Sequence, residues 1–215
     1  MSVQRILFRF SKEGDASYLS HRDLMRLFER ALRRAELPVR MTQGFNPHPK
    51  LSILLALPLG VEADEEAIEI EFEPPVAPAA ALDRLRAQLP EGVRLTRAEA
   101  LPPGARARVV AAAYEAQLPP DAPLTQGDLE RLQARDAIPI ERTSPKGRRT
   151  VDIRPALAAL SLEGRTLRFE LHVGQAALPR PTEIVAACLR RDDTELPGLR
   201  LRRTTLTLAI PSAPA

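Results

Sequence analysis

Residues 3–35 read VQRILFRFSKEGDASYLSHRDLMRLFERALRRA, and this stretch decides the fold that we expect for the first half of the chain. Residues 3–10 alternate apolar and polar side chains, a pattern typical of a β-strand. Ser20 can cap a following helix, because Asp23 stands three residues later, close to the spacing of a capping box. Pro38 prevents that helix from continuing. The stretch therefore predicts a strand followed directly by a helix.

The expected helix has two distinct faces. At about 100° per residue, its apolar residues fall on one arc and should face the core; they are Leu24, Leu27, Phe28, Ala31 and Ala35. The opposite arc carries four arginines: Arg22, Arg26, Arg30 and Arg33. Like charges one helical turn apart repel mildly, and phosphate groups would relieve that repulsion. The arc could contact the phosphates of a nucleic acid, the alternative being a solvated face partly neutralised by nearby carboxylates.

The rest of the first half extends the pattern. Residues 39–42 and 52–57 predict short strands, residues 67–72 alternate strictly, residues 79–89 predict a second helix and residues 93–98 a closing strand. The order is that of a ferredoxin-like domain with an added strand or hairpin.

The second half repeats this plan after a Pro/Gly-rich linker at residues 101–108. Strands are expected at 111–117, 167–173 and 199–209, helices at 125–134 and 182–189, and a hairpin from 139–143 and 149–154. Asp152 and Arg154 share one face of this hairpin and should pair. We therefore predict an α+β protein of two tandem ferredoxin-like domains (β-α-β-β-α-β type with added strands), spanning residues 1–103 and 109–215.

Composition excludes several classes of function. A single cysteine, Cys188, allows neither an intrachain disulfide nor a cysteine-based zinc or iron–sulfur site within this chain. Phosphate-binding, dinucleotide-binding and nucleophile-elbow motifs are absent from the sequence. No apolar run is long enough for a membrane span, and residues 1–10 do not resemble a signal peptide. We expect a cytoplasmic protein that holds no metal or cofactor and does not bind membranes.

The charge is unevenly distributed. Residues 1–50 carry 10 Lys/Arg against 5 Asp/Glu, whereas residues 51–100 carry 4 against 10. Such separation produces a local field that can attract a polyanion. Arginine makes up 28 of the 31 cations. It binds phosphate well, although a GC-rich genome would give the same bias. Aromatic residues make up only 4% of the chain, which disfavours a base-stacking platform of several rings.

Two further segments are candidate binding sites. In the loop at residues 43–50 (QGFNPHPK), two prolines restrict the backbone, so Phe45, Asn46, His48 and Lys50 should be displayed on a stiff loop. The alternative is a tight connection in which Phe45 fills the core. Near the tip of the second-half hairpin lie Lys146, Arg148 and Arg149. They could contact phosphates, or they could only make the protein surface more soluble.

His21 and His48 raise a catalytic alternative. If the loop folds back along the helix, the two imidazoles could act as general acid and base in metal-independent cleavage of RNA. No spacing rule supports that approach, and His21 also fits the role of a residue that starts the helix.

Several motifs resemble one bacterial family. They are FRFSK at 8–12, YLSHRDLMR at 18–26, ERALRRA at 29–35, QGFNPHPK at 43–50, PLGV at 58–61 and VDIRP at 151–155. Together they resemble the radical-SAM-associated proteins of unknown function, whose domain stands alone or forms the C-terminal part of longer radical SAM proteins. Members of that family are commonly encoded beside ribonuclease G and ribosomal protein genes.

The resemblance implies RNA or ribosome biology. We therefore expect an RNA- or ribonucleoprotein-binding accessory protein, linked to RNA processing, RNA modification or the ribosome. A radical SAM protein is a second candidate partner, and DNA is not expected. The alternatives are an enzyme component, either the partner subunit of a radical SAM reaction or the endonuclease above, and a protein-interaction scaffold. The scaffold would use the acidic strand face of Glu69, Glu71 and Glu73.

Overall fold

The computed structural model describes residues 3–120, 122–144, 147–174, 178–191, 196 and 198–211. The chain divides into two compact units, Met1–Val109 with Leu208–Ala215 and Val110–Thr207. Strands and four α-helices occur together in the described residues, which confirms the prediction of a mixed α+β fold. None of the described helices is long and apolar enough to cross a membrane.

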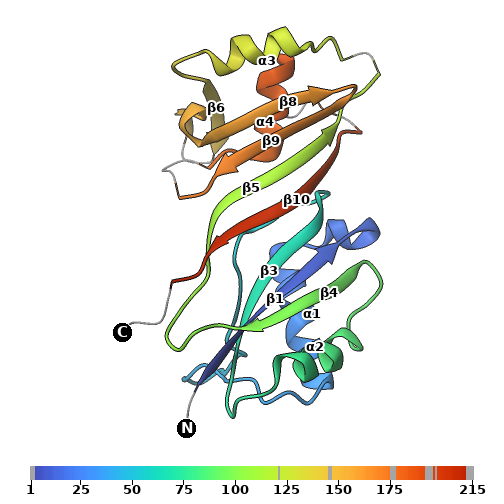
Figure 1. Ribbon diagram of the computed structural model, residues 1–215, viewed down its shortest axis with the longest axis vertical. Helices are drawn as coiled ribbons and strands as arrows, with labels where there is room; N and C mark the ends of the chain where they lie inside the picture. Colours follow the sequence, from blue (N-terminus) through green and yellow to red (C-terminus); the bar gives the residue numbers. More distant parts are fainter. Residues whose placement is uncertain are drawn as a thin grey trace. The chain divides into compact units, whose positions relative to one another are not determined.

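The first unit is built around an antiparallel sheet in the order β4-β1-β3, with the short β2 also paired to β3. Its strands are β1 (Gln4–Lys12), β2 (Leu51–Ile53), β3 (Glu62–Phe72) and β4 (Val93–Ala100). Its helices are α1 (His21–Arg34) and α2 (Pro78–Arg86). Figure 1 shows both helices on one face of this sheet, where their apolar side chains share one core with the strands.

The core of the first unit follows from the alternation in β1. Ile6, Phe8 and Phe10 are fully buried and face the helices. Phe10 meets Phe28 of α1 edge to face, with ring centroids 5.1 Å apart. Burying each such side chain stabilises the fold by about 1.5–3 kcal/mol. As predicted, Ser20 caps α1: its hydroxyl accepts a hydrogen bond from the Asp23 N–H.

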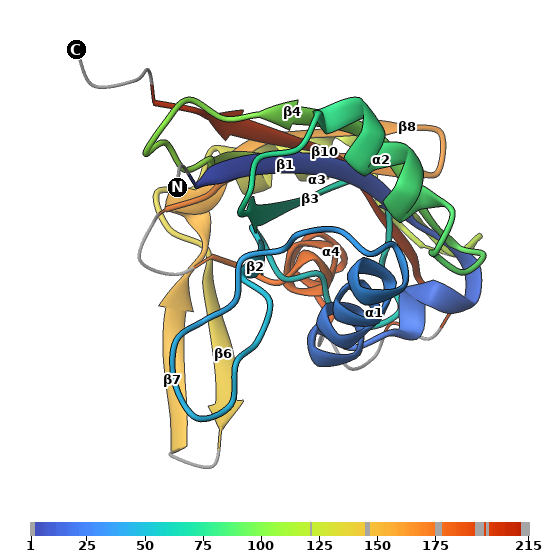
Figure 2. The ribbon, with the colours of Figure 1, turned by 90° about the horizontal axis from the view of Figure 1, so that it is seen from below.

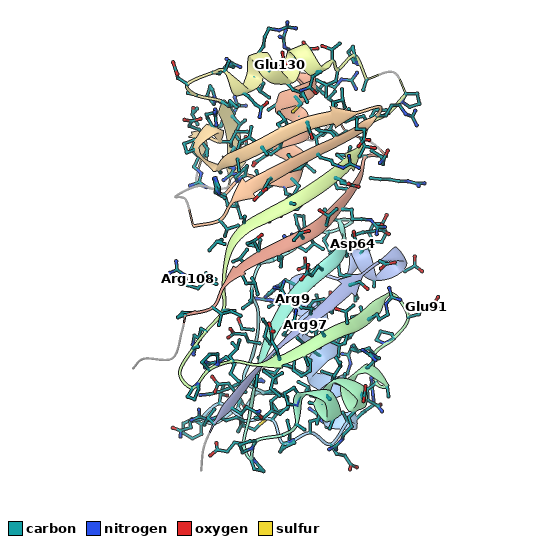
Figure 3. All side chains as sticks on the ribbon, in the orientation of Figure 1. Arg9, Asp64, Glu91, Arg97, Arg108 and Glu130 are labelled. Carbon is teal, nitrogen blue, oxygen red and sulfur yellow. The ribbon has the colours of Figure 1, made fainter. Side chains whose placement is uncertain are left out.

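The other face of this sheet carries the alternate residues of β1. Arg9 of β1 and Arg97 of β4 lie opposite each other in the register and are labelled in Figure 3. Residues 105–107 contact this face, because the Arg5 guanidinium donates to the Ala105 carbonyl and the Ala107 N–H donates to the Glu69 carboxylate. The face is therefore partly covered by the chain itself.

The second unit has strands in the order β10-β5-β9-β8 and a separate β6-β7 hairpin. Its strands are β5 (Arg108–Gln117), β6 (Pro139–Ser144), β7 (Gly147–Asp152), β8 (Leu157–Glu163), β9 (Thr166–His172) and β10 (Arg200–Ala209). Its helices are α3 (Gln126–Gln133) and α4 (Pro181–Leu189). Tyr114 of β5 stacks on Phe169 of β9 at 5.2 Å between ring centroids, and the buried Arg203 donates to the Tyr114 hydroxyl.

Some predicted elements differ from the structure. Residues 39–42 form only isolated bridges, and β2 covers three residues rather than the six predicted. Strand β8 was not predicted, because its sequence LAALSLE places good helix formers in a strand whose partner, β9, comes later in the chain. Asp152 and Arg154 do not pair. Asp152 accepts from the N–H groups of Ile138 and Arg154, whereas the Arg154 guanidinium donates to backbone carbonyls.

Candidate functional site

The segment between α1 and β2 is a stem pinned to the edge of β3. The Arg40 N–H donates to the Glu71 carbonyl at 2.8 Å, the Lys50 N–H to the Arg40 carbonyl at 2.8 Å, and the Glu71 N–H to the Lys50 carbonyl at 3.0 Å. One step further out, the Thr42 N–H donates to the His48 carbonyl at 2.7 Å. These bonds bring residues 40–42 and 48–50 side by side, so residues 43–47 form a tip whose two ends are fixed.

The tip displays its side chains to solvent. Phe45 is 107% exposed, so its ring contacts essentially none of the surrounding chain. Asn46 and His48 are exposed as well, and the His48 N–H donates to the Thr42 hydroxyl at 2.9 Å. The alternative in which Phe45 fills the core is therefore wrong. The stem bonds fix both ends of the tip, and the Phe45 ring projects from it into solvent.

Beneath the stem, two carboxylates of β3 form a buried charge cluster with basic side chains. Arg5 of β1 donates to Glu71 at 2.5 Å and lies 3.4 Å from Glu69. Glu71 also lies 3.2 Å from Arg40 and 3.8 Å from Lys50. The Glu69 and Glu71 side chains are only 6% and 11% exposed. The predicted acidic docking face of Glu69, Glu71 and Glu73 is thus not an exposed face, because its first two members are occupied by internal ion pairs.

This cluster lowers the pKa of Glu71. Burial alone would raise that pKa, but the hydrogen bond from Arg5 and the charges of Arg5, Lys50 and Arg40 together outweigh burial. Glu71 is therefore ionised at neutral pH and holds the basic side chains around it. The β1–β3 register places Arg5 directly opposite Glu71, which gives this arrangement a backbone cause.

A shallow cavity of about 270 Å³ opens between the cluster and the stem. Its lining includes Lys50 and Thr42 from the stem, Ser52 from β2, and Arg106 from the segment that follows β4. Arg106 is 71% exposed and its nearest carboxylate atom, on Glu71, is 4.0 Å away. Lys50 and Arg106 thus place positive charge at the base of the exposed loop, next to two hydroxyl groups.

The arginine arc of α1 is exposed, as its helical spacing predicted. Arg22, Arg26, Arg30 and Arg33 all face solvent. Arg26 lies 3.9 Å from Asp23, and the other three form no ion pair with any residue that the structure describes. In Figure 2, α1 and the loop that follows it lie on the same side of the β4-β1-β3 sheet. The arginine arc and the loop backbone therefore share one side of the sheet, whereas the Lys50 and Arg106 side chains reach Glu71 on the other face.

The histidine pair receives no geometric support as a catalytic couple. His21 is the first residue of α1 and is exposed, as is His48. No hydrogen bond joins these two described side chains. Among the described residues, no group of three His, Cys, Asp or Glu side chains is placed to hold a metal ion. Their catalytic role stays a prediction.

Two of the three basic residues near the tip of the β6-β7 hairpin lie within the described residues. Lys146 lies outside the described residues, whereas Arg148 and Arg149 are exposed on β7. Their neighbour Arg142 on β6 points inward instead and forms a two-pronged ion pair with Glu183 of α4, at 2.8 and 2.6 Å. The hairpin is thereby attached to α4.

Sequence reasoning did not identify Arg5, Arg40 and Arg106 as members of the site. The available signal was the matching of basic positions in β1 with acidic positions in β3, which becomes visible only when the register of the two strands is known.

Comparison with known proteins identifies the family of this chain but assigns it no activity. No curated protein matches the chain. A solved structure, the crystal structure of an unknown protein from Galdieria sulphuraria, is 14% identical, with 97% of this chain and 99% of that chain covered, at a TM-score of 0.28. That likeness is too weak to support an argument. The family model of uncharacterized proteins conserved in bacteria (DUF2344) matches residues 5–181, and the chain belongs to this family.

Proposed function

We propose that this protein is an RNA- or ribonucleoprotein-binding accessory protein whose loop at residues 43–50 contacts an unpaired base. The observation that carries the proposal is the full exposure of Phe45 at the tip of a stem that is hydrogen-bonded to β3. Proteins recognise single-stranded RNA by stacking its bases on aromatic side chains, and a fixed loop loses little entropy when it binds. One exposed ring on a fixed stem suits one flipped or unpaired base.

Positive charge next to the ring supports a nucleic acid over an apolar partner. Lys50 and Arg106 lie at the base of the loop, on the sheet face that carries Glu69 and Glu71, and α1 with its arginine arc lies on the loop side of the sheet (Figure 2). Phosphate contacts supply most of the affinity of such surfaces and make it dependent on salt. In this proposal the arc and the loop base bind the RNA backbone while Phe45 stacks on a base.

Fluorescence anisotropy with a labelled 12-nucleotide single-stranded RNA tests the role of the ring. Phe45→Ala should weaken binding by about 5- to 150-fold, because stacking on one base is worth ~1–3 kcal/mol. Tyr18→Ala is the matched control, since Tyr18 is the other exposed aromatic residue of this unit and lies outside the loop. Equal affinity of wild type and Phe45→Ala for every RNA tried would refute the proposal.

Salt dependence tests the role of the arginine arc. Reversing Arg22 and Arg30 to Glu should reduce the slope of log K against log salt by about 0.7 for each phosphate that the variant no longer binds. Reversing Arg94 and Arg97, two exposed arginines of β4, should leave the slope close to that of wild type. If reversing Arg22 and Arg30 leaves the slope equal to that of wild type, the RNA backbone does not contact the arginine arc.

The same RNA also tests the catalytic alternative. Cleavage during incubation, lost in both His21→Ala and His48→Ala, would identify an endonuclease and not an accessory protein. Intact RNA together with binding favours the accessory role.

We also infer three features that the sequence predicts: two ferredoxin-like domains, an association with radical SAM proteins and a cytoplasmic location. The strand order in each unit, with its two helices, supports two tandem ferredoxin-like domains. The motifs at 18–26 and 43–50 support an association with radical SAM proteins, and the lone cysteine supports a cytoplasmic location. Co-purification of an iron–sulfur protein with the tagged chain would test the association.

A further inference from the structure

The second unit contains a cavity of about 320 Å³ between α3, α4 and β6. Ligand sites in proteins usually enclose about 300–1,000 Å³, so this cavity has room for one small metabolite. Part of its wall is apolar, and the residues that form that part are Leu132, Ile138, Pro139, Ile140, Ala186 and Ala187. It lies in the other unit from loop 43–50, so it does not depend on the function proposed for that loop.

The cavity wall carries charges of both signs. Arg135, Arg190 and Arg191 lie among its lining residues, and so do Glu141 and Glu183. Glu183 and Arg190 are seven residues apart along α4 and its C-cap, which is about 10 Å at 1.5 Å per residue. An elongated ligand with an anion at one end and hydrogen-bond donors at the other would match this polarity.

Of the two lining carboxylates, Glu183 is already engaged within the protein. Glu183 accepts both prongs of Arg142 and also caps its own helix, with the Arg180 N–H donating to it at 2.7 Å. The guanidinium groups of Arg135, Arg190 and Arg191 form no ion pair with residues of the described ranges, which stop at Arg191 and resume at Leu196. Within those ranges, the charge left for a ligand is positive.

Arg190 adds a second, independent observation. It caps α4 in the left-handed conformation, with φ 54° and ψ 43°. Glycine is the usual residue at such a position, because a side chain there is strained, and strained residues cluster at functional sites. Arg190 also lines the adjoining cavity of about 340 Å³ together with Arg135, Arg131 and Asp128, of which the last two form an ion pair. Arg190 thus lines both cavities from a backbone position that glycine usually occupies.

We propose that this cavity binds a nucleoside monophosphate. Its phosphate is held by Arg135, Arg190 and Arg191, whose planar groups can each give two parallel hydrogen bonds to phosphate oxygens. The sugar and base lie along the apolar wall, with their donors toward Glu141. Inorganic phosphate would leave that wall unused. A free nucleotide and the 5′-phosphorylated end of an RNA share this chemistry.

Calorimetric titration of the full chain with AMP, GMP, CMP and UMP tests the proposal. At least one nucleotide should bind with a Kd below about 1 mM. The matching nucleoside and inorganic phosphate should each bind at least about tenfold more weakly, because each lacks one half of the contacts. Absence of nucleotide binding, or a nucleoside that binds as tightly as its nucleotide, overturns the proposal.

Arg190→Gly separates a binding role from a structural one. Glycine suits the left-handed backbone, so the unfolding temperature should stay unchanged or rise, while nucleotide affinity should fall at least about tenfold. Arg135→Ala should weaken binding likewise. The control is Arg165→Ala, an exposed arginine in the β8–β9 turn that lines neither cavity. Undiminished binding by Arg190→Gly overturns the proposal.

A pair of eight-nucleotide RNAs distinguishes the two sources of the ligand. If the cavity accepts an RNA end, the 5′-phosphorylated RNA binds more tightly than its 5′-hydroxyl form, and Arg190→Gly abolishes the difference. If both RNAs bind equally while AMP or another nucleotide still binds, the ligand is the free nucleotide. Phe45→Ala should not change either comparison.

Discussion

Replacing Glu71 by glutamine tests whether the charge cluster beneath the stem holds the first unit together. The substitution keeps the volume of the side chain but removes the charge that Arg5, Arg40 and Lys50 share. Breaking a buried ion pair by removing one partner costs ~3–5 kcal/mol. Arg5 keeps Glu69 at 3.4 Å, and Arg40 and Lys50 are about one-third exposed, so part of the loss is made up. We expect Glu71→Gln to lower the free energy of unfolding by about 2–3 kcal/mol at pH 7.

Urea unfolding followed by far-ultraviolet circular dichroism measures this loss. The control is Glu65→Gln on the same strand, whose partner Arg9 lies 2.9 Å away but whose own side chain is 36% exposed. Because Glu65 is more exposed than Glu71, loss of its pair with Arg9 should cost less stability than loss of the Glu71 pairs. If the two variants lose the same stability, the reasoning from burial is refuted.

The pH dependence of the loss supplies a second check. The folded-state pKa of Glu71 is lowered, so its ion pairs stabilise the fold fully above the ordinary glutamate pKa and are lost as pH falls through the folded value. The difference between wild type and Glu71→Gln should therefore be constant near neutral pH and shrink as the solution becomes more acidic than about pH 4.5. A difference that stays constant into that acidic range would show that the carboxylate charge is not its cause.

Three further predictions concern other parts of the chain. Burial raises the pKa of the Cys188 thiol to about 12, so at pH 8 it should react with an alkylating reagent ~1,000-fold more slowly in the native protein than in urea; equal rates would mean that the thiol is exposed. Gly92→Ala should cost more than Gly104→Ala by urea unfolding. Both residues have positive φ, but only at Gly92 would the new Cβ meet a backbone atom, the Glu13 carbonyl at 2.6 Å. Thr125→Ala removes the hydroxyl of the capping box of α3 and should lower stability by about 1 kcal/mol, measured in the same way.

Elements defined by local chemistry were predictable from the sequence. The two faces of α1 and its Ser20 cap depend on residues three or four positions apart, and the structure confirms them. Strand β8 was missed because its residues favour a helix, although the Gly164-Arg165 turn to β9 was a local signal for a hairpin.

The environment of the polar residues in β3 was not predictable in the same way. Alternation correctly placed Glu69 and Glu71 on one strand face, but it could not say whether that face meets water. The structure covers it with residues 105–107 and fills it with arginines from other segments. For Phe45 the sequence left two interpretations, display on a stiff loop and burial in the core, and the stem bonds with the exposed ring decide for display. In both cases, interactions between residues distant in sequence decide.

The charge cluster and the exposed ring are best understood together. A buried ion cluster adds little net stability compared with apolar packing of the same volume, because its charges must first lose their water. Unlike apolar packing, the ion pairs require a defined geometry. Glu71 binds side chains from β1 and from both arms of the stem, and so fixes where the stem leaves the sheet. An apolar patch at this place would attract Phe45 toward the sheet without regard to geometry. Charged groups do not attract an apolar ring in this way. We infer that the cluster helps to keep the Phe45 ring exposed, where it can contact the proposed RNA.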